Sequence, residues 1–288
     1  MCYDRVPSRR AFAALLAAGA GMAAVAGCTP DPGGAPPSQA PSVAGPGGTG
    51  SASPLASTTP EPGGASLSPT SSAPPSVSAA PPSSALSEKH SLADPASQWV
   101  IVNKHRPLTP LQYAPADLVQ PRVELAASGE GSLLNTITAA AAEKLFAGAA
   151  AAGVAMTLAS GYRSFQTQSD VYDGYVGLSG QESADTASAR PGFSEHQTGW
   201  AFDIGDGGGA CSFEPCFADQ PAAIWAKANA YKYGFVIRYP WMLQEITGYY
   251  YEPWHLRFVG IEAASDMASR GIRTLEEYFG LEPAPGYQ

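Results

Sequence analysis

Hydrophobic and polar positions alternate along residues 199–205, which predicts a short β-strand. Trp200, Phe202 and Ile204 would point to one face of that strand, and Asp203 would point to the other. The carboxylate of Asp203 is therefore expected to lie away from the aromatic core face, where Trp200 packs. Three more segments are predicted to form short strands, residues 154–159, 235–237 and 249–251.

Helices are predicted between these strands. Residues 135–152 are rich in alanine and are followed by Gly153, a residue that commonly ends helices. A further helix is expected to begin at Pro221 and to end near Gly234, because Pro favours helix starts and Gly favours helix ends. Short strands that alternate with helices of ordinary length predict an α+β fold.

A third helix is expected next to a possible functional cation. Ser164 can cap a helix over residues 165–176, which would place Gln168 in its first turns. Arg163 then occupies the corner between a strand and this helix. Arg163 could serve chemistry or simply hold that corner.

Composition divides the chain into regions. Residues 29–98 contain no aromatic residue and are dominated by Pro, Ser, Ala and Gly, so they cannot bury enough apolar surface to offset the entropy of ordering. We predict a disordered tether over residues 29–96. Residues 97–288 hold all five Trp and are long enough for a single core, so we predict one folded domain there.

The first 28 residues have the features of an export signal. Arg9 and Arg10 precede an apolar run over residues 11–26 that is too short to span a bilayer stably. The segment around the two arginines resembles a twin-arginine signal, and Val-Ala-Gly-Cys ending at Cys28 resembles a bacterial lipobox. We expect a lipoprotein anchored through Cys28 outside the cytoplasm. An ordinary secretory peptide with a coincidental cysteine is the alternative.

Two cysteines remain in the predicted domain. Cys211 and Cys216 should form a disulfide outside the reducing cytosol. A metal-binding role is less favoured because no second Cys or His pair accompanies them.

Charge excludes some partners. The predicted domain carries 12 Lys and Arg against 20 Asp and Glu, and the whole chain has a formal net charge of −9. A nucleic-acid partner is therefore disfavoured. Recognition of an anionic peptide would depend on a few placed cations.

Four residues in the last third of the chain suggest a zinc hydrolase. His196 and Asp203 lie in SEHQTGWAFD, and Glu252 and His255 lie in EPWH. Two imidazoles and one carboxylate can hold Zn²⁺ with one position left for water, and a remaining carboxylate can take that water's proton. Pro253 is expected to break the strand, so that a 3₁₀-like turn brings Glu252 and His255 to one side.

The motifs also resemble a known family. SGYRS at 160–164 with Gln168, SEHQTGWAFDIG at 194–205 and EPWH at 252–255 resemble the VanY-type D-alanyl-D-alanine carboxypeptidases of the M15 zinc peptidase family. The resemblance covers most of residues 97–288. It implies a compact α+β domain of the Hedgehog/DD-peptidase type, with a central antiparallel sheet flanked by helices.

The resemblance also implies roles for single residues. It implies metal ligands at His196, Asp203 and His255, a base at Glu252, a cation over the scissile carbonyl at Arg163, and substrate contacts at Gln168, Ser194 and Trp254. Gln168 and Ser194 could instead cap helices or turns, and which oxygen Arg163 would hold stays open. His90 and His105 lack acidic partners and are interpreted as non-functional.

These observations predict a zinc-dependent carboxypeptidase with one Zn²⁺ per chain. Its substrate would be the peptidoglycan stem peptide, from which it removes the terminal D-alanine, and we expect a monomer. Three alternatives remain: an L,D-carboxypeptidase acting on the shortened stem, an endopeptidase acting on crosslinks, and a non-catalytic zinc-bearing wall-binding lipoprotein.

Overall fold

The computed structural model describes residues 90–288. The predicted export signal, the lipidation site Cys28 and residues 29–89 of the predicted tether lie outside the described residues.

The ordered domain begins earlier than composition predicted. The Leu92 carbonyl accepts a hydrogen bond from Arg106, and the Pro95 carbonyl accepts one from the indole of Trp200. Residues 90–96 therefore pack on the domain and do not belong to a tether.

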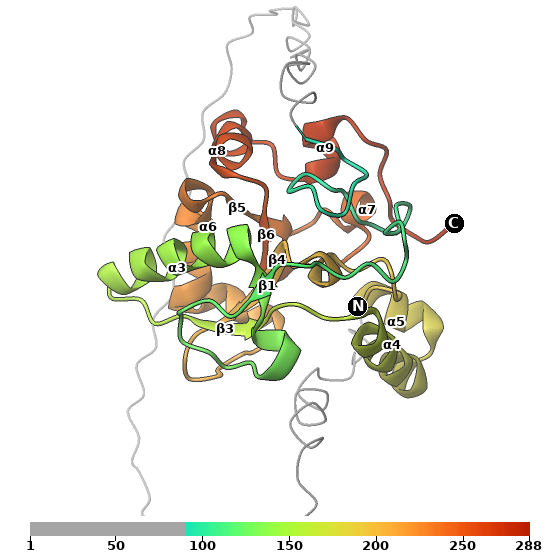
Figure 1. Ribbon diagram of the computed structural model, residues 1–288, viewed down its shortest axis with the longest axis horizontal. Coiled ribbons are helices and arrows are strands. Elements are labelled where there is room, and N and C mark those ends of the chain that lie inside the picture. The colour runs from blue at the N-terminus through green and yellow to red at the C-terminus, as the bar shows by residue number, and fades with distance from the viewer. Residues whose placement is uncertain (1–89) are drawn as a thin grey trace, which may run out of the picture. The chain divides into compact units, whose positions relative to one another are not determined.

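The centre of the domain is a four-stranded antiparallel sheet with strand order β3-β4-β6-β5 (Figure 1). The strand bounds are β3 Thr157–Ser160, β4 Ala201–Gly205, β5 Phe235–Tyr239 and β6 Glu252–Phe258. A separate two-stranded sheet pairs β1 (Leu118–Val119) with β2 (Leu134–Asn135). The predicted α+β class with a central antiparallel sheet is confirmed.

Helices surround this sheet. The α-helices are α3 Thr136–Ala151, α4 Phe165–Ser179, α5 Gln181–Ala187, α6 Pro221–Asn229, α7 Gln244–Thr247, α8 Ile261–Arg270 and α9 Leu275–Phe279. The 3₁₀ helices are η1 Gly129–Ser132, η2 Glu195–Thr198, η3 Pro215–Asp219 and η4 Ala230–Tyr233. Within residues 90–288, no helix combines the length and apolarity that a membrane crossing requires.

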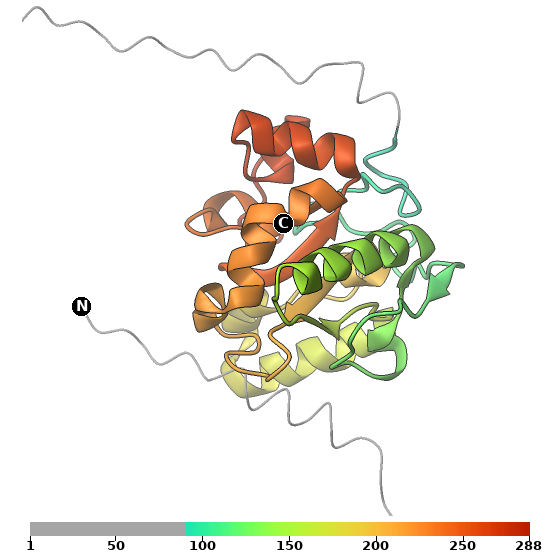
Figure 2. The ribbon, with the colours of Figure 1, turned by 90° about the vertical axis from the view of Figure 1, so that its left-hand side faces the viewer.

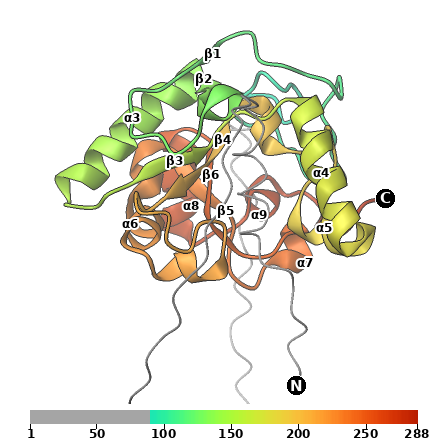
Figure 3. The ribbon, with the colours of Figure 1, turned by 90° about the horizontal axis from the view of Figure 1, so that it is seen from below.

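The helices form layers on the sheet. Helices α3 and α6 lie on one side, and α4 and α5 lie on the other (Figures 2 and 3). Leu145 and Phe146 of α3 share the main core cluster with Phe202 and Leu256 of the sheet, and all four are buried. A second cluster packs α8 and α9 against Trp99. The core therefore holds one sheet face, and the other face is left for polar side chains.

Local signals in the sequence explain the helix starts. The side chain of Asn135 accepts hydrogen bonds from the first turn of α3, and Ser164 Oγ accepts one from the Thr167 amide at the start of α4. The predicted alternation in β4 is also confirmed, because Trp200, Phe202 and Ile204 all lie in the core cluster.

Two predictions about the C-terminal strands are wrong. Residues 249–251 form no strand, and residues 252–255 do not form a 3₁₀-like turn, since β6 begins at Glu252. The register explains how Pro253 is tolerated. Ile237 pairs with Leu256 but Tyr239 pairs with Glu252, so β6 carries extra residues against β5. Such an irregularity is where a proline fits inside a sheet.

Candidate metal centre and active site

Three side chains converge on one point at the polar side of the sheet. His196 comes from η2, Asp203 from β4 and His255 from β6, and one potential ligand atom of each lies within 4.8 Å of the others. All three residues are buried, and the two imidazole rings are 4.9 Å apart at 89°. The sequence prediction that these residues meet is therefore matched by their positions.

Backbone geometry explains the convergence. Asp203 and His255 are direct partners in the register of β4 and β6. Gly199, in the left-handed conformation with φ of 70°, ends η2 and turns the chain into β4. A Cβ atom at Gly199 would lie 2.8 Å from the amide nitrogen of Asn135, so this turn requires glycine.

Outer hydrogen bonds orient both imidazoles. His196 Nδ1 lies 2.7 Å from the carbonyl oxygen of Gly161, and His255 Nε2 lies 3.3 Å from Glu195 Oε2. In the neutral form of each ring, a proton donated outward by this nitrogen leaves His196 Nε2 and His255 Nδ1 with lone pairs that face Asp203, and a cation bound there displaces any second proton. Such outer partners commonly fix the tautomer of a ligating histidine.

Burial and neighbouring charges shift the pKa values in the cluster. Burial lowers the pKa of His196, Arg163 acts in the same direction, and Asp203 opposes them. Burial alone would raise the pKa of Asp203, but His196 and His255 outweigh it and hold that pKa well below its usual range. Burial likewise opposes a charged His255, whereas Asp203 and Glu195 raise its pKa to about 9. Asp203 is therefore ionised at neutral pH, as a metal ligand must be.

The contact between Asp203 and His255 fits a cation site. Asp203 Oδ1 is buried and lies 3.1 Å from His255 Nδ1, yet it makes no hydrogen bond within the described part of the chain. A buried carboxylate oxygen normally has a hydrogen-bond donor or an ion beside it. Two imidazoles and one carboxylate also form a known donor set for catalytic zinc. The three residues therefore fit a zinc ion.

Glu252 lies next to this cluster, and its Oε2 is 3.8 Å from His255 Nδ1. Both residues line a cavity of about 490 Å³ that also contains His196 and Asp203. The irregular pairing of β6 with β5 brings positions i and i+3 of this strand to the same side. The geometry thus gives the result that the sequence predicted, through a strand irregularity in place of a turn.

Arg163 lies on the wall of the same cavity, between β3 and α4. Its guanidinium donates to Gln168 Oε1 at 2.8 Å and to Ser160 Oγ at 3.2 Å. The amide nitrogen of Gln168 donates in turn to Ser188 Oγ and to the Ala189 carbonyl. Gln168 is fully buried and lies behind Arg163, not on the cavity wall, so the structure places it as an anchor for the guanidinium.

Ser194 and Trp254 both line the cavity. Trp254 is also part of the main core cluster, and its ring meets Phe213 edge to face at 6.1 Å. Phe213 belongs to the loop that the disulfide between Cys211 and Cys216 closes. The predicted cysteine pair therefore supports one wall of the cavity.

An aromatic wall that the sequence analysis missed completes the cavity. Tyr239 packs on His255 with ring centroids 4.9 Å apart, and Tyr249 packs on Tyr239 at 4.7 Å. The hydroxyl groups of Tyr249 and Tyr287 are 3.2 Å apart, so the C-terminal segment supports this wall.

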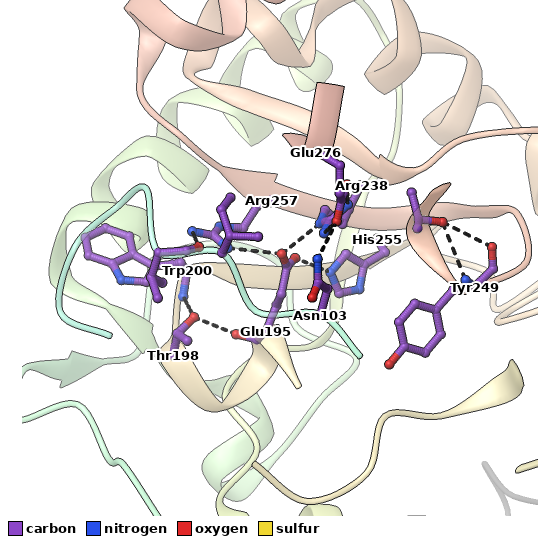
Figure 4. A network of polar contacts seen from close by, with 12 residues as sticks. Asn103, Glu195, Thr198, Trp200, Arg238, Tyr249, His255, Arg257 and Glu276 are labelled. Carbon is purple, nitrogen blue, oxygen red and sulfur yellow. Dashed lines mark hydrogen bonds and ion pairs between the residues drawn. The ribbon is translucent and has the colours of Figure 1, made fainter. Parts of the chain in front are cut away.

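Sequence reasoning also missed Glu195 and its partners. Glu195 adjoins His196 in the motif, and its fully buried carboxylate contacts Arg238, Arg257 and His255 (Figure 4). Arg238 further pairs with Glu276 at 2.7 Å. The available signal was a second acidic residue inside an otherwise buried motif, but its partners are distant in the sequence.

A cavity that joins a three-residue cation site, a carboxylate and an anchored guanidinium, on an α+β domain, defines a metal-dependent hydrolase. Residues 131–261 match the family described as VanY, D-alanyl-D-alanine carboxypeptidase. A D-alanyl-D-alanine carboxypeptidase of Enterococcus faecalis is 35% identical over 196 residues, which cover 64% of this chain and 67% of the relative. The chain belongs to the VanY family.

Solved structures agree with this assignment. The structure of the LdcB LD-carboxypeptidase is 40% identical with a TM-score of 0.61, over 65% of this chain and 87% of that one. VanYB in complex with D-alanine-D-alanine is 35% identical with a TM-score of 0.50, over 63% of this chain and 96% of that one. The predicted family and enzyme class, a D-alanyl-D-alanine carboxypeptidase, are confirmed.

Proposed function

We propose that this protein removes the terminal D-alanine from peptidoglycan stem peptides, with one Zn²⁺ held by His196 Nε2, the Asp203 carboxylate and His255 Nδ1. The observation that carries the proposal is the meeting of these three donors with Glu252 and Arg163 around one cavity. Family membership supports the substrate, since the matching family and the Enterococcus faecalis relative are described as D-alanyl-D-alanine carboxypeptidases.

Glu252 supplies the base for this chemistry. Zinc, when bound, supplies a Lewis acid that polarises the scissile carbonyl and lowers the pKa of water. Glu252 accepts the proton of the attacking water and then delivers it to the leaving amine. Its position near His255 puts this carboxylate within the same cavity as the metal donors.

Arg163 supplies the positive charge for the substrate. Its planar donors suit either the oxyanion that develops on the scissile carbonyl or the terminal carboxylate of the peptide. Gln168 and Ser160 hold the guanidinium in place. Ser194 and Trp254 would contact the peptide from the cavity wall.

A Glu252→Gln variant tests the assigned base. We expect zinc and peptide binding to persist while the rate falls by about 10²- to 10⁴-fold, because the variant cannot take the proton. Glu245→Gln, at an exposed position on α7, is the matched control and should keep full activity. Activity at the wild-type level in Glu252→Gln would falsify the assignment. His196→Ala should instead lose zinc, as measured by metal content after dialysis.

An L,D-carboxypeptidase is the second candidate, because LdcB is named an LD-carboxypeptidase. Mass spectrometry of muropeptides digested with the zinc-loaded protein separates the two. Loss of the fifth stem residue identifies D,D-cleavage, and loss of the fourth identifies L,D-cleavage.

Membrane attachment through Cys28 is also part of the proposal. A lipid on Cys28 and a flexible segment after it would let the enzyme work on wall peptides above its own membrane. A flexible coil of about 65 residues has an r.m.s. span of several tens of ångströms. Labelling with palmitate should be lost in Cys28→Ala, and persistent labelling would contradict the anchor.

A further inference from the structure

A network of buried charges lies directly behind His255 (Figure 4). Glu195 Oε1 accepts hydrogen bonds from Arg238 Nε at 2.8 Å and from Arg257 Nη1 at 3.1 Å. Arg238 also donates to both oxygens of Glu276, at 2.7 and 3.0 Å. The side chains of Glu195, Arg238, Arg257 and Glu276 are buried, with exposed fractions of 1% or less.

Such a network is costly to bury. Desolvation of each ion costs several kcal/mol, and apolar residues of similar volume often stabilise a core as well or better. The network nevertheless contacts the candidate metal site, because Glu195 Oε2 lies 3.3 Å from His255 Nε2. Arg257 and His255 share one face of β6 because they are two residues apart, so a single carboxylate can reach both. This placement indicates that the buried network acts on the His255 ring.

The network can determine which ring nitrogen of His255 carries the proton. A neutral imidazole has one N–H, and only the nitrogen without it can bind a metal. The Glu195 carboxylate accepts hydrogen bonds but cannot donate while it is ionised, so it favours a proton on Nε2. Nδ1, which lies 3.1 Å from Asp203 Oδ1, is then left with its lone pair toward the cation site.

We propose that Glu195 is a positioning residue that holds His255 in the Nε2–H tautomer and so presents Nδ1 to the metal. This inference rests on the proposed function, and in particular on His255 as a ligand. Arg238 and Arg257 hold the Glu195 carboxylate in place through their hydrogen bonds to Oε1, whereas Glu276 pairs with Arg238 and does not reach His255. Tyr239, packed on the His255 ring, restrains the ring plane.

The groups around Glu195 use its carboxylate as an acceptor on both oxygens. Oε1 accepts from Arg238 and Arg257, and Oε2 faces His255 Nε2. Glu276 and Asn103 complete the outer layer, since Asn103 Nδ2 donates to Glu276 Oε1 at 3.0 Å. Within the described residues, every charged group that touches Glu195 is a cation or His255.

Zinc affinity of the full-length protein tests the proposal, with Glu195→Gln compared against Glu276→Gln. Both variants neutralise one buried carboxylate that pairs with Arg238, but Glu276 does not touch His255. We expect Glu195→Gln to raise the zinc Kd by about 10- to 100-fold, as outer-partner changes do, and Glu276→Gln to leave it near wild type. Competition with a chromophoric chelator measures both. Wild-type affinity in Glu195→Gln, or equal weakening in the two variants, would overturn the proposal.

A measurement on the wild-type protein keeps the test valid if Glu195→Gln fails to fold. Imidazole ¹⁵N NMR of the zinc-loaded protein should show His255 protonated at Nε2 and metal-bound at Nδ1, and the opposite tautomer would contradict the proposal. Failure of the proposed function looks different, because the wild-type protein would then release no terminal D-alanine from muropeptides, a result that does not depend on how Glu195→Gln and Glu276→Gln compare in zinc affinity.

Discussion

Asp203 and His255 are cross-strand partners in the central sheet, so one backbone pair supplies two of the three candidate metal donors. Directly opposed residues of an antiparallel pair have Cβ atoms about 4.5–5.5 Å apart, a spacing that suits a shared ion. The hydrogen bonds of the sheet therefore set the separation of these two donors. His196 is added from η2 and depends on a different contact, its hydrogen bond to the Gly161 carbonyl.

That dependence makes Gly161→Ala a specific test of the His196 position. A Cβ atom at Gly161 would lie 2.5 Å from the Leu133 carbonyl oxygen and 2.9 Å from that of Gly131, so the backbone must shift. We expect a loss of about 1–3 kcal/mol in the free energy of unfolding, together with weaker zinc binding because the acceptor for His196 Nδ1 moves. Urea denaturation and chelator competition measure the two effects.

Gly177→Ala is the matched control for that variant. Gly177 lies inside α4, and a Cβ atom added there would meet no atom within 4 Å, so alanine should stabilise the helix by about 0.5–1 kcal/mol. Its zinc affinity should equal that of the wild type. If Gly161→Ala behaves like Gly177→Ala, the Gly161 carbonyl does not position His196.

Arg163→Lys tests whether the fork of the guanidinium matters or only its charge. Lysine keeps the positive charge but cannot bond Gln168 and Ser160 while it also presents planar donors to substrate. We expect kcat/KM to fall by about 10²-fold with zinc content unchanged. Steady-state kinetics on a peptide ending in D-Ala-D-Ala, with metal analysis of the same sample, checks both parts. A change of less than about threefold would show that charge alone suffices.

The features that could be predicted from the sequence are those that neighbouring residues determine. Alternation in β4 and the Ser164 cap of α4 are both local, and each has a stereochemical cause within a few residues. The ligand motif could be recognised for a similar reason, because His196 and Asp203 lie within one short stretch of sequence.

The features that could not be predicted depend on distant partners. Glu195 meets Arg238 and Arg257 across 43 and 62 residues, and no local pattern links them. The prediction that Pro253 breaks the strand at EPWH was wrong for a related reason, since it ignored the neighbouring strands. Proline normally disfavours a central strand, but pairing of β6 with both β4 and β5 overrides that preference once an irregularity removes the need for its N–H.

The buried Glu276 carboxylate predicts a pH dependence of stability. Burial alone would raise the pKa of Glu276, but Arg238 outweighs burial and lowers it below the ordinary value of 4.5. A lowered pKa means that the pair contributes stability above about pH 4.5 and loses it as the pH falls toward the folded-state value. We expect Glu276→Gln to be less stable than wild type by roughly 3 kcal/mol near pH 7.

The difference in stability between the wild type and Glu276→Gln should narrow as the pH falls below about 4.5, because Glu276 of the wild type then becomes protonated and neutral, as glutamine is. Urea midpoints across this range provide the measurement. A constant difference at all pH values would mean that packing, and not the charge of Glu276, causes the loss.

Reduction of the disulfide should affect substrate binding more than turnover. Cys211 and Phe213 both have positive φ, at 55° and 57°, so the loop is strained and the disulfide restrains it. Release of so short a loop should lower the free energy of unfolding by about 2 kcal/mol. Phe213 would then lose its edge contact with Trp254, and the cavity wall that it forms would loosen. We expect KM to rise severalfold while kcat changes less, because Glu252 and the metal donors lie outside the loop.

Kinetics with and without a phosphine reductant measure this effect. A protein with both cysteines changed to alanine should have the KM of the reduced enzyme, and the reductant should not change it. Identical KM values for the oxidised and reduced enzyme would show that the loop does not shape the substrate site.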